Sequence, residues 1–247
     1  MTRYRAAAIH LSISAVIGAS TLALLYFLWY PAPYFELSGG RDLAQLLVSV
    51  DVVLGPLLTL IVFSPGKKTL RMDLSIIAAI QLSALAYGLW VMAQARPVYA
   101  VFAIDRLVIV AANQIDAEDL HKAKPPFDRL SWSGPQFASV EMPTDPQARN
   151  EAMDAGLAGK ELEHMPQYFQ SYAAAAGTAL RRAKPLAERL QASADARAMI
   201  EPWLKTRGLD AAQVHYLPVT GRKGSMTALL DGATGSLLGV IDTPPWD

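Results

Sequence analysis

The sequence predicts a membrane protein in which three transmembrane α-helices are followed by an extracytoplasmic, periplasmic α+β domain. Two observations lead to this fold class. Residues 1–95 hold only ten of the chain's 22 basic and 22 acidic side chains, which makes this part far more apolar than a soluble domain. Residues 96–247 hold the other 34 charges and contain strand-like and helical patterns. We therefore expect two parts, a membrane domain over 1–95 and a folded domain over 96–247.

Three runs in the first part are apolar over their whole length: 6–30, 43–63 and 74–95. A helix rises about 1.5 Å per residue, so roughly 20 apolar residues cross a hydrocarbon core about 30 Å thick. Asp51 is the single Asp, Glu, Lys or Arg within the three runs. Each run is therefore predicted to be one membrane span.

The basic side chains between the spans predict the orientation of the chain. The N-terminal tail and the loop at 64–73 hold five Lys or Arg residues, whereas the loop at 31–42 and the residue after the third span hold two. Loops rich in Lys and Arg stay in the cytoplasm. The N-terminus is therefore predicted to be cytoplasmic and 96–247 periplasmic, in a multi-pass protein of a bacterial inner membrane. The aromatic side chains near the outer interface agree with this depth: Trp29, Tyr30, Tyr34 and Trp90.

Asp51 lies near the middle of the second span, where an acidic side chain costs about 2.5–3.5 kcal/mol on insertion scales. Residues four apart share a helix face, so Asp51, Gly55 and Thr59 form a small, polar stripe. Pro56 has no amide donor and clashes with the preceding turn, which predicts a kink. Gln81 lies at a similar depth in the third span.

Two interpretations of this stripe remain open. Asp51 can be protonated and hydrogen-bonded inside a three-helix bundle, where it fixes the packing. Alternatively, Asp51, Gly55, Pro56, Thr59 and Gln81 form an intramembrane contact for a partner helix, because acidic groups within membranes mark functional sites.

Strand-like runs lie at both ends of the second part, with helical patterns between them. Helices are expected from Asp145 as the N-cap, from Pro166 to residue 185, and over 186–207 with a break or bend near Pro202. Residues 124–137 are expected to be a loop. The terminal segments are expected to share one sheet. The expected strands are 98–104, 107–111, 214–219, 226–230 and 236–241.

The sequence argues against several classes of chemistry. The chain has no cysteine, which excludes disulfides, thiolate metal sites and cysteine nucleophiles. The four histidines lack metal-ligand spacing, and no nucleotide, hydrolase or metalloprotease motif is present. Residues 96–247 carry a net charge of −2, so a nucleic-acid partner is not expected. We expect a protein that is not an enzyme and has no cofactor or metal.

Four segments resemble the TfpX/TfpZ family of type IV pilin accessory proteins, which includes FimB-like members. They are "LWYPAPYFELSGG" (28–40), "VDVVLGPLLTLIVFSPGKK" (50–68), "ARPVYAVFAIDR" (95–106) and "DGATGSLLGVIDTPPW" (231–246). The resemblance implies an inner-membrane accessory factor that helps pilin subunits reach or enter the pilus, without a catalytic site. It also implies a type IV pilin subunit as partner, contacted at its transmembrane helix and its head. The residues do not indicate an oligomeric state.

Two other functions remain compatible with the residues. A periplasmic sensor or ligand-binding module anchored by three helices predicts a deep polar pocket in 96–247 and tolerance of Asp51→Leu. A membrane-bound enzyme without a recognisable motif predicts titratable side chains that converge near the outer membrane surface, where Asp105, Arg106 and Asp242 are the first candidates.

Overall fold

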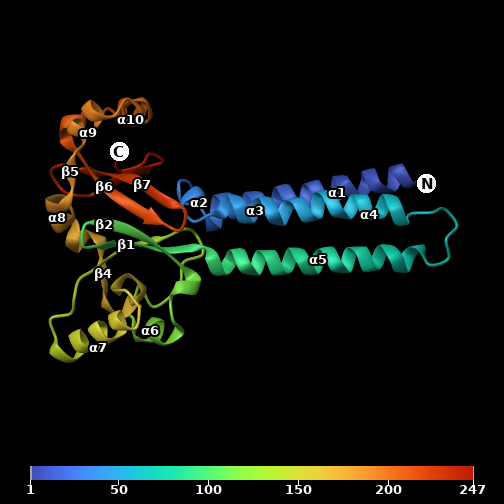
Figure 1. Ribbon diagram of the computed structural model, residues 1–247, viewed down its shortest axis with the longest axis horizontal. Helices are drawn as coiled ribbons and strands as arrows, with labels where there is room; N and C mark the ends of the chain where they lie inside the picture. The colour runs from blue at the N-terminus through green and yellow to red at the C-terminus, as the bar shows by residue number, and fades with distance from the viewer. Residues whose placement is uncertain (1, 247) are drawn as a thin grey trace.

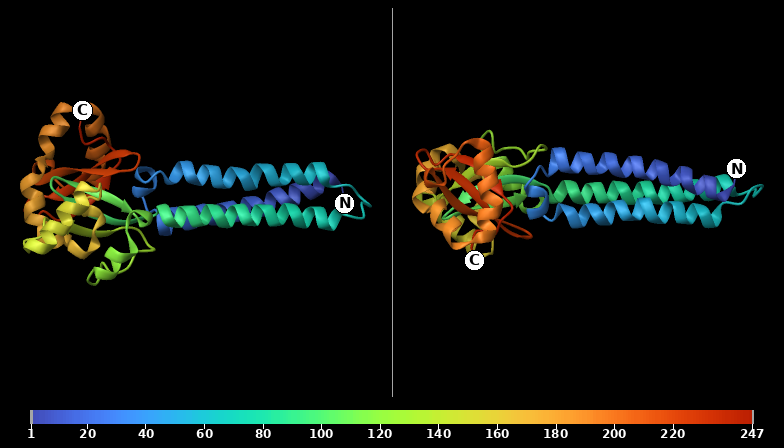
Figure 2. Two further views of the ribbon diagram at one scale, coloured as in Figure 1. Left: turned by 60° about the horizontal axis from the view of Figure 1, so that its bottom comes forward. Right: turned by 90° about the horizontal axis from the view of Figure 1, so that it is seen from above.

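The computed structural model describes residues 2–246 and consists of a long helical bundle that projects from a sheet-containing domain, called the head below (Figure 1). Three helical segments in the bundle are long and apolar enough to cross a membrane: Arg3–Trp29, Gly40–Val62 and Leu70–Ala95. Figure 2 shows them side by side in two further views. The N-terminus and the loop before the third segment lie at the end of the bundle away from the head.

Two of the three segments contain a π-helical turn. The first consists of α1 (Arg3–Leu24) and a π turn over Leu25–Trp29, and the third is α5 (Leu70–Ala95). The second consists of α3 (Gly40–Ser49), a π turn over Val50–Leu54 and α4 (Gly55–Val62).

The π turn of the second segment ends at Leu54, two residues before Pro56. Because proline cannot donate to the carbonyl four residues earlier and its ring collides with it, a locally wider turn relieves the clash. Figure 1 shows α3 and α4 as one continuous rod. The irregularity expected at Pro56 is therefore a π turn within a continuous helix.

The head contains an eight-stranded mixed sheet with the order β4-β3-β1-β2-β6-β7-β8, in which β5 also pairs with β6. Its strands are β1 (Pro97–Ala103), β2 (Arg106–Ala111), β3 (Gln136–Val140), β4 (Phe169–Ser171), β5 (Lys184–Pro185), β6 (Val214–Gly221), β7 (Gly224–Asp231) and β8 (Leu237–Ile241). Its helices are α6 (Ala117–Lys122), α7 (Pro146–Leu157), α8 (Tyr172–Arg182), α9 (Leu186–Ala192) and α10 (Ala194–Arg207). The parallel pairing of β2 with β6 confirms that the first and last strands share a sheet.

Three elements of the head differ from the sequence prediction. The helix expected over 186–207, with a break or bend near Pro202, divides instead at Ser193, whose side chain caps α10, and Pro202 lies inside α10. Residues 136–140 form β3, although the Pro- and Gly-rich stretch 124–137 predicts a loop, because the strand pairs in parallel with β1. The helix expected from Pro166 begins only at Tyr172. Pro166 instead starts a 3₁₀ turn, and Phe169–Ser171 is drawn into the sheet as β4 by its pairing with β3. The N-cap at Asp145 is confirmed, since its side chain accepts a hydrogen bond from the Ala148 amide over 2.9 Å.

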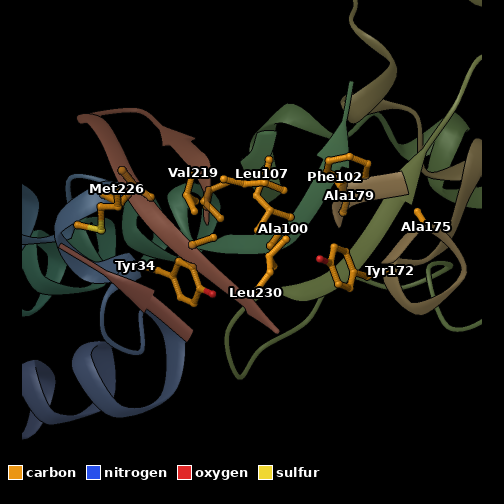
Figure 3. Close-up of a cluster of buried hydrophobic side chains, with 14 residues drawn as sticks. Tyr34, Ala100, Phe102, Leu107, Tyr172, Ala175, Ala179, Val219, Met226 and Leu230 are labelled. Carbon is orange, nitrogen blue, oxygen red and sulfur yellow. The ribbon is translucent and has the colours of Figure 1, made fainter. Parts of the chain in front are cut away.

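Hydrophobic clusters cover both faces of the sheet. The cluster in Figure 3 joins α8 to the sheet through Tyr172, Ala175 and Ala179. The opposite face is covered by α9 and α10 beside β6 and β7, and by residues around Phe127 beside β1 and β3.

A short helix between the first two long segments, α2 (Tyr34–Leu37), ties the bundle to the head. Tyr34 and Leu37 are buried and belong to the head's core cluster. The Lys223 amide donates to the Leu37 carbonyl over 3.0 Å, and the Lys223 ammonium pairs with Asp42. The segment between the helices therefore supplies part of the head's core, and the head has contacts to the bundle beyond the direct continuation of α5 into β1.

Candidate functional site

The Asp51 cluster, by which we mean Asp51, Gly55, Pro56, Thr59 and Gln81, lies in the interior of the bundle. Asp51 is 7% exposed and Thr59 is 2% exposed. Gly55 and Pro56 are also buried, and Gln81 is half-buried. The stripe of the second segment therefore faces the other two helices rather than the outside of the bundle.

Gln81 connects α5 to the second segment. Its amide Nε2 donates to the Asp51 backbone carbonyl over 3.2 Å. A Cβ atom placed on Gly55 would lie 2.1 Å from the same Nε2. Only glycine leaves room for this approach, so the structure brings Asp51, Gly55 and Gln81 together and shows why position 55 has no side chain.

His10 connects α1 to the same cluster. Its ring Nδ1 lies 2.6 Å from the Thr59 hydroxyl. Sequence reasoning misses this contact, because a single histidine in a span is an ordinary packing residue and its partner is 49 positions away. With His10 included, the cluster joins all three long helices.

The cluster retains hydrogen-bonding capacity. Within residues 2–246, the Asp51 Oδ1 and the Gln81 Oε1 are buried and have no hydrogen-bond partner. A protonated Asp51 has an O–H group to donate, whereas two bare acceptors buried in an apolar region are costly. The arrangement can therefore hold a proton, or accept a donor from outside the three helices.

The tight fit at Gly55 leaves no open groove between α4 and α5 at this position. This geometry favours the packing interpretation of the Asp51 cluster in the closed bundle. For a partner helix to reach the cluster between α4 and α5, these two helices must separate.

The head contains a second candidate site, a cleft beside the junction of β2 and β6. Two cavities of about 550 and 940 Å³ share Val108, Glu161 and Thr220 as lining residues. Val108 and Thr220 are register partners in the parallel β2–β6 pair. The cleft thus follows the seam between the N-terminal and C-terminal strands of the sheet.

Two acidic side chains from the segment before β4 line this cleft. Glu161 and Glu163 are these two residues. Burial and, to a smaller extent, a side-chain hydrogen bond with Glu161 together raise the pKa of Glu163 to about 7, although the nearby charge of Arg106 opposes the shift. Burial also lowers the pKa of the neighbouring His164. Among the carboxyl groups of the head whose pKa is shifted, Glu163 is therefore the one that most readily carries a proton near neutral pH.

At the end of the cleft away from the bundle, the turn between β1 and β2 holds Ile104 with φ of +61° and its side chain 80% exposed. A β-branched residue rarely adopts this left-handed conformation, which costs of order 1–3 kcal/mol. The turn thus presents a bulky apolar side chain to solvent at a conformational cost.

The three residues named for an enzyme do not converge. Asp105 and Arg106 form a 2.8 Å ion pair with each other in the β1–β2 turn and line the larger cavity of the cleft. Asp242 lines a different cavity of about 310 Å³. In this second cavity, Arg41 forms an ion pair with Glu36, and Lys223 forms one with Asp42. No group of three or more His, Asp or Glu side chains in residues 2–246 is arranged to hold a metal ion.

Comparison with known proteins gives the family. The family model described as "Fimbrial assembly protein FimB" matches residues 1–39. The fimbrial assembly protein of Dichelobacter nodosus serogroup I is 31% identical over 227 residues, which cover 90% of this chain and 88% of that protein. The serogroup E1 protein is 30% identical over the same coverage. The protein of serogroups C1 and C2 is 39% identical over 117 residues, 47% of this chain and 89% of that protein.

No solved structure matches the chain. The two long alignments cover nine-tenths of the chain and so include most of the head, which means that the likeness is not confined to a shared membrane segment. The chain belongs to the FimB family of fimbrial assembly proteins.

Proposed function

We propose that this chain is an inner-membrane accessory factor that assists type IV pilin subunits during pilus assembly, without catalysing a reaction. The observation that carries the proposal is the end-to-end similarity to fimbrial assembly proteins. The three apolar helices and the attached head are consistent with it. A pilin subunit has a hydrophobic helix and a head, so a factor that handles it needs one surface in the membrane and one outside.

In the proposed topology, the N-terminus and the loop before α5 are cytoplasmic and the head is periplasmic. Both cytoplasmic elements lie at the same end of the bundle (Figure 1). The Lys and Arg residues of the two elements are therefore gathered at one end of the bundle. An end rich in these residues stays in the cytoplasm, which supports the proposed orientation.

The absence of cysteine from the natural chain allows a direct test of this topology. A single cysteine at Lys205→Cys, on exposed α10, is expected to react with a membrane-impermeant maleimide in intact spheroplasts. A cysteine at Lys68→Cys, in the exposed loop before α5, is expected to react only after lysis. The reverse pattern of labelling would place the head in the cytoplasm and remove the proposed role.

Within the membrane, we propose that the hydrophobic helix of the pilin subunit packs against α4 and reaches the Asp51 cluster when α4 and α5 separate. Leu54 is 49% exposed on the outer surface of the bundle, one turn from buried Asp51. The unpartnered Asp51 Oδ1 and Gln81 Oε1 are acceptors that a donor on the incoming helix could satisfy.

Photo-crosslinking in cells that make pilin tests this contact. A photoreactive residue at position 54 is expected to crosslink to pilin, and one at position 51 is expected to do so if the bundle opens. Ile80, 61% exposed on α5, is the matched control position. A crosslink to pilin from position 54 without one from position 51 would show that the Asp51 cluster serves only to pack the three helices. Products from the head alone, for example from position 104, would remove the intramembrane half of the proposal.

A further inference from the structure

The loop between α6 and β3 reaches back from the head to the end of the bundle. Its Trp132 ring lies 5.6 Å from the ring of Trp29, measured between centroids. Trp29 is the last residue of the first membrane-length segment. A residue of the head is therefore fixed at the level where the first long helix ends.

Further contacts hold this loop in place. The Arg96 guanidinium lies 3.7 Å from the centroid of the Trp132 ring and donates to the Ser131 carbonyl over 2.9 Å. Arg96 itself is 4% exposed and directly follows α5. Gly134, with φ of +86°, approaches Pro31 so closely that a Cβ on it would lie 2.6 Å from the proline ring. The tip of the loop thus rests on the ends of two long segments, α1 with its π turn and α5.

Despite these contacts, Trp132 is 56% exposed. Residues 130–140 contain no charged side chain, so the loop can enter a less polar layer without moving a charge out of water. An indole ring with one apolar body and one N–H donor favours the boundary between hydrocarbon and water. Its position, its exposure and the lack of charge in residues 130–140 all fit the lipid headgroup layer, in which the neighbouring Arg96 guanidinium is also tolerated.

We propose that Trp132 inserts into the outer headgroup layer of the membrane and holds the head against the lipid surface. This inference rests on the proposed membrane topology. It assigns to the head a lipid contact separate from the three helices. Because Arg96 and Trp29 hold the ring in place, little side-chain freedom remains to be lost when it meets lipid.

The test uses the full chain, labelled with the environment-sensitive dye NBD at a single cysteine and reconstituted in vesicles of phosphatidylethanolamine and phosphatidylglycerol. Ser133→Cys places the dye beside Trp132 on an exposed side chain. Its emission is expected to be blue-shifted and to be quenched more by lipids brominated near the headgroup than by lipids brominated near the chain end. Adding Trp132→Ala to this variant is expected to weaken both effects.

Two control positions make the outcomes distinguishable. The dye at Lys205→Cys on α10 is expected to report water, and the dye at Leu54→Cys is expected to be quenched by the deep bromines. If position 54 is quenched and position 133 matches position 205, the lipid contact of Trp132 is wrong while the membrane topology stands. That result would make the exposed indole available to a protein partner instead. Loss of quenching at position 54 would overturn the topology itself.

Discussion

Leu37→Ala is expected to destabilise the head by about 2–5 kcal/mol, the range for truncating a buried leucine. Leu37 is 2% exposed and belongs to the cluster that also contains Tyr34, Tyr172 and Leu230 (Figure 3). A Cβ on Gly221 would lie 2.6 Å from the Leu37 Cγ, which shows how closely the side chain fits against the end of β6. Alanine would leave a cavity at the point where the bundle enters the core of the head.

The quantity to measure is the free energy of unfolding of the purified full chain in detergent, obtained from a denaturant titration. Leu46→Ala is the matched control, because Leu46 lies on α3 and is 66% exposed. Its truncation is expected to change the free energy by no more than about 0.5 kcal/mol. Equal effects of the two substitutions would show that α2 is not part of the head's core in solution.

The position of Leu37 also shows where prediction from the sequence ends. The three long helices are predictable because an uncharged apolar run of about 20 residues is typical of a membrane span and rare in soluble domains. The structure starts them a few residues earlier, at Arg3, Gly40 and Leu70, since a helix continues past the apolar boundary when its polar first turn can face water. The segment 31–42 has the turn-rich composition of a connection, and only its contact with distant strands makes α2 part of a core.

The sheet follows the same principle. The hairpin pairs β1–β2 and β6–β7 are predictable because alternation and turn residues lie close together in the chain. β3 is hidden by the prolines and glycine that precede it, and its partner β1 is more than 30 residues away. The same distance hides the Trp132 contact with Arg96 and the clustering of Glu161 and Glu163 at the β2–β6 seam.

Within the candidate site, Asp51, Gly55 and Thr59 are predictable as one stripe because helical spacing is a local property. Their partners are not. Gln81 is suggested by its depth alone, and His10 has no signal beyond being a polar residue in an apolar run. The role of the stripe depends on whether its contacts with His10 and Gln81 stay closed or open to admit a partner helix. Helical spacing along the sequence carries no information on this point.

Gly55→Ala is expected to destabilise the bundle by about 0.5–1.5 kcal/mol, the usual net worth of one hydrogen bond, because the clashing atoms are the movable end of the Gln81 side chain. The added methyl group would lie 2.1 Å from the Gln81 Nε2 and 2.6 Å from its Cδ, so α4 and α5 must move apart or Gln81 must leave its place. Either change breaks the Gln81 hydrogen bond to the Asp51 carbonyl. The expected result is a lower melting temperature of the full chain in detergent.

Gly18→Ala is the matched control in the same bundle. There a Cβ would lie 3.4 Å from the nearest side-chain atom of Val48, at the edge of ordinary van der Waals contact, so little change is expected. Gln81→Ala removes the clashing amide, and the double variant Gly55→Ala/Gln81→Ala is expected to be more stable than the two single effects predict by addition. Additive effects would contradict the close approach of α4 and α5 at this point.

The same double variant separates the two interpretations of the Asp51 cluster. If the cluster only packs the bundle, a double variant that recovers stability is expected to support pilus assembly as well. If it instead contacts the pilin helix, assembly is expected to fail although the bundle is folded, because the Gln81 amide is gone. A stable chain without pili would then locate the function of Gln81 in the partner contact, since the packing between Gly55 and Gln81 would have been replaced.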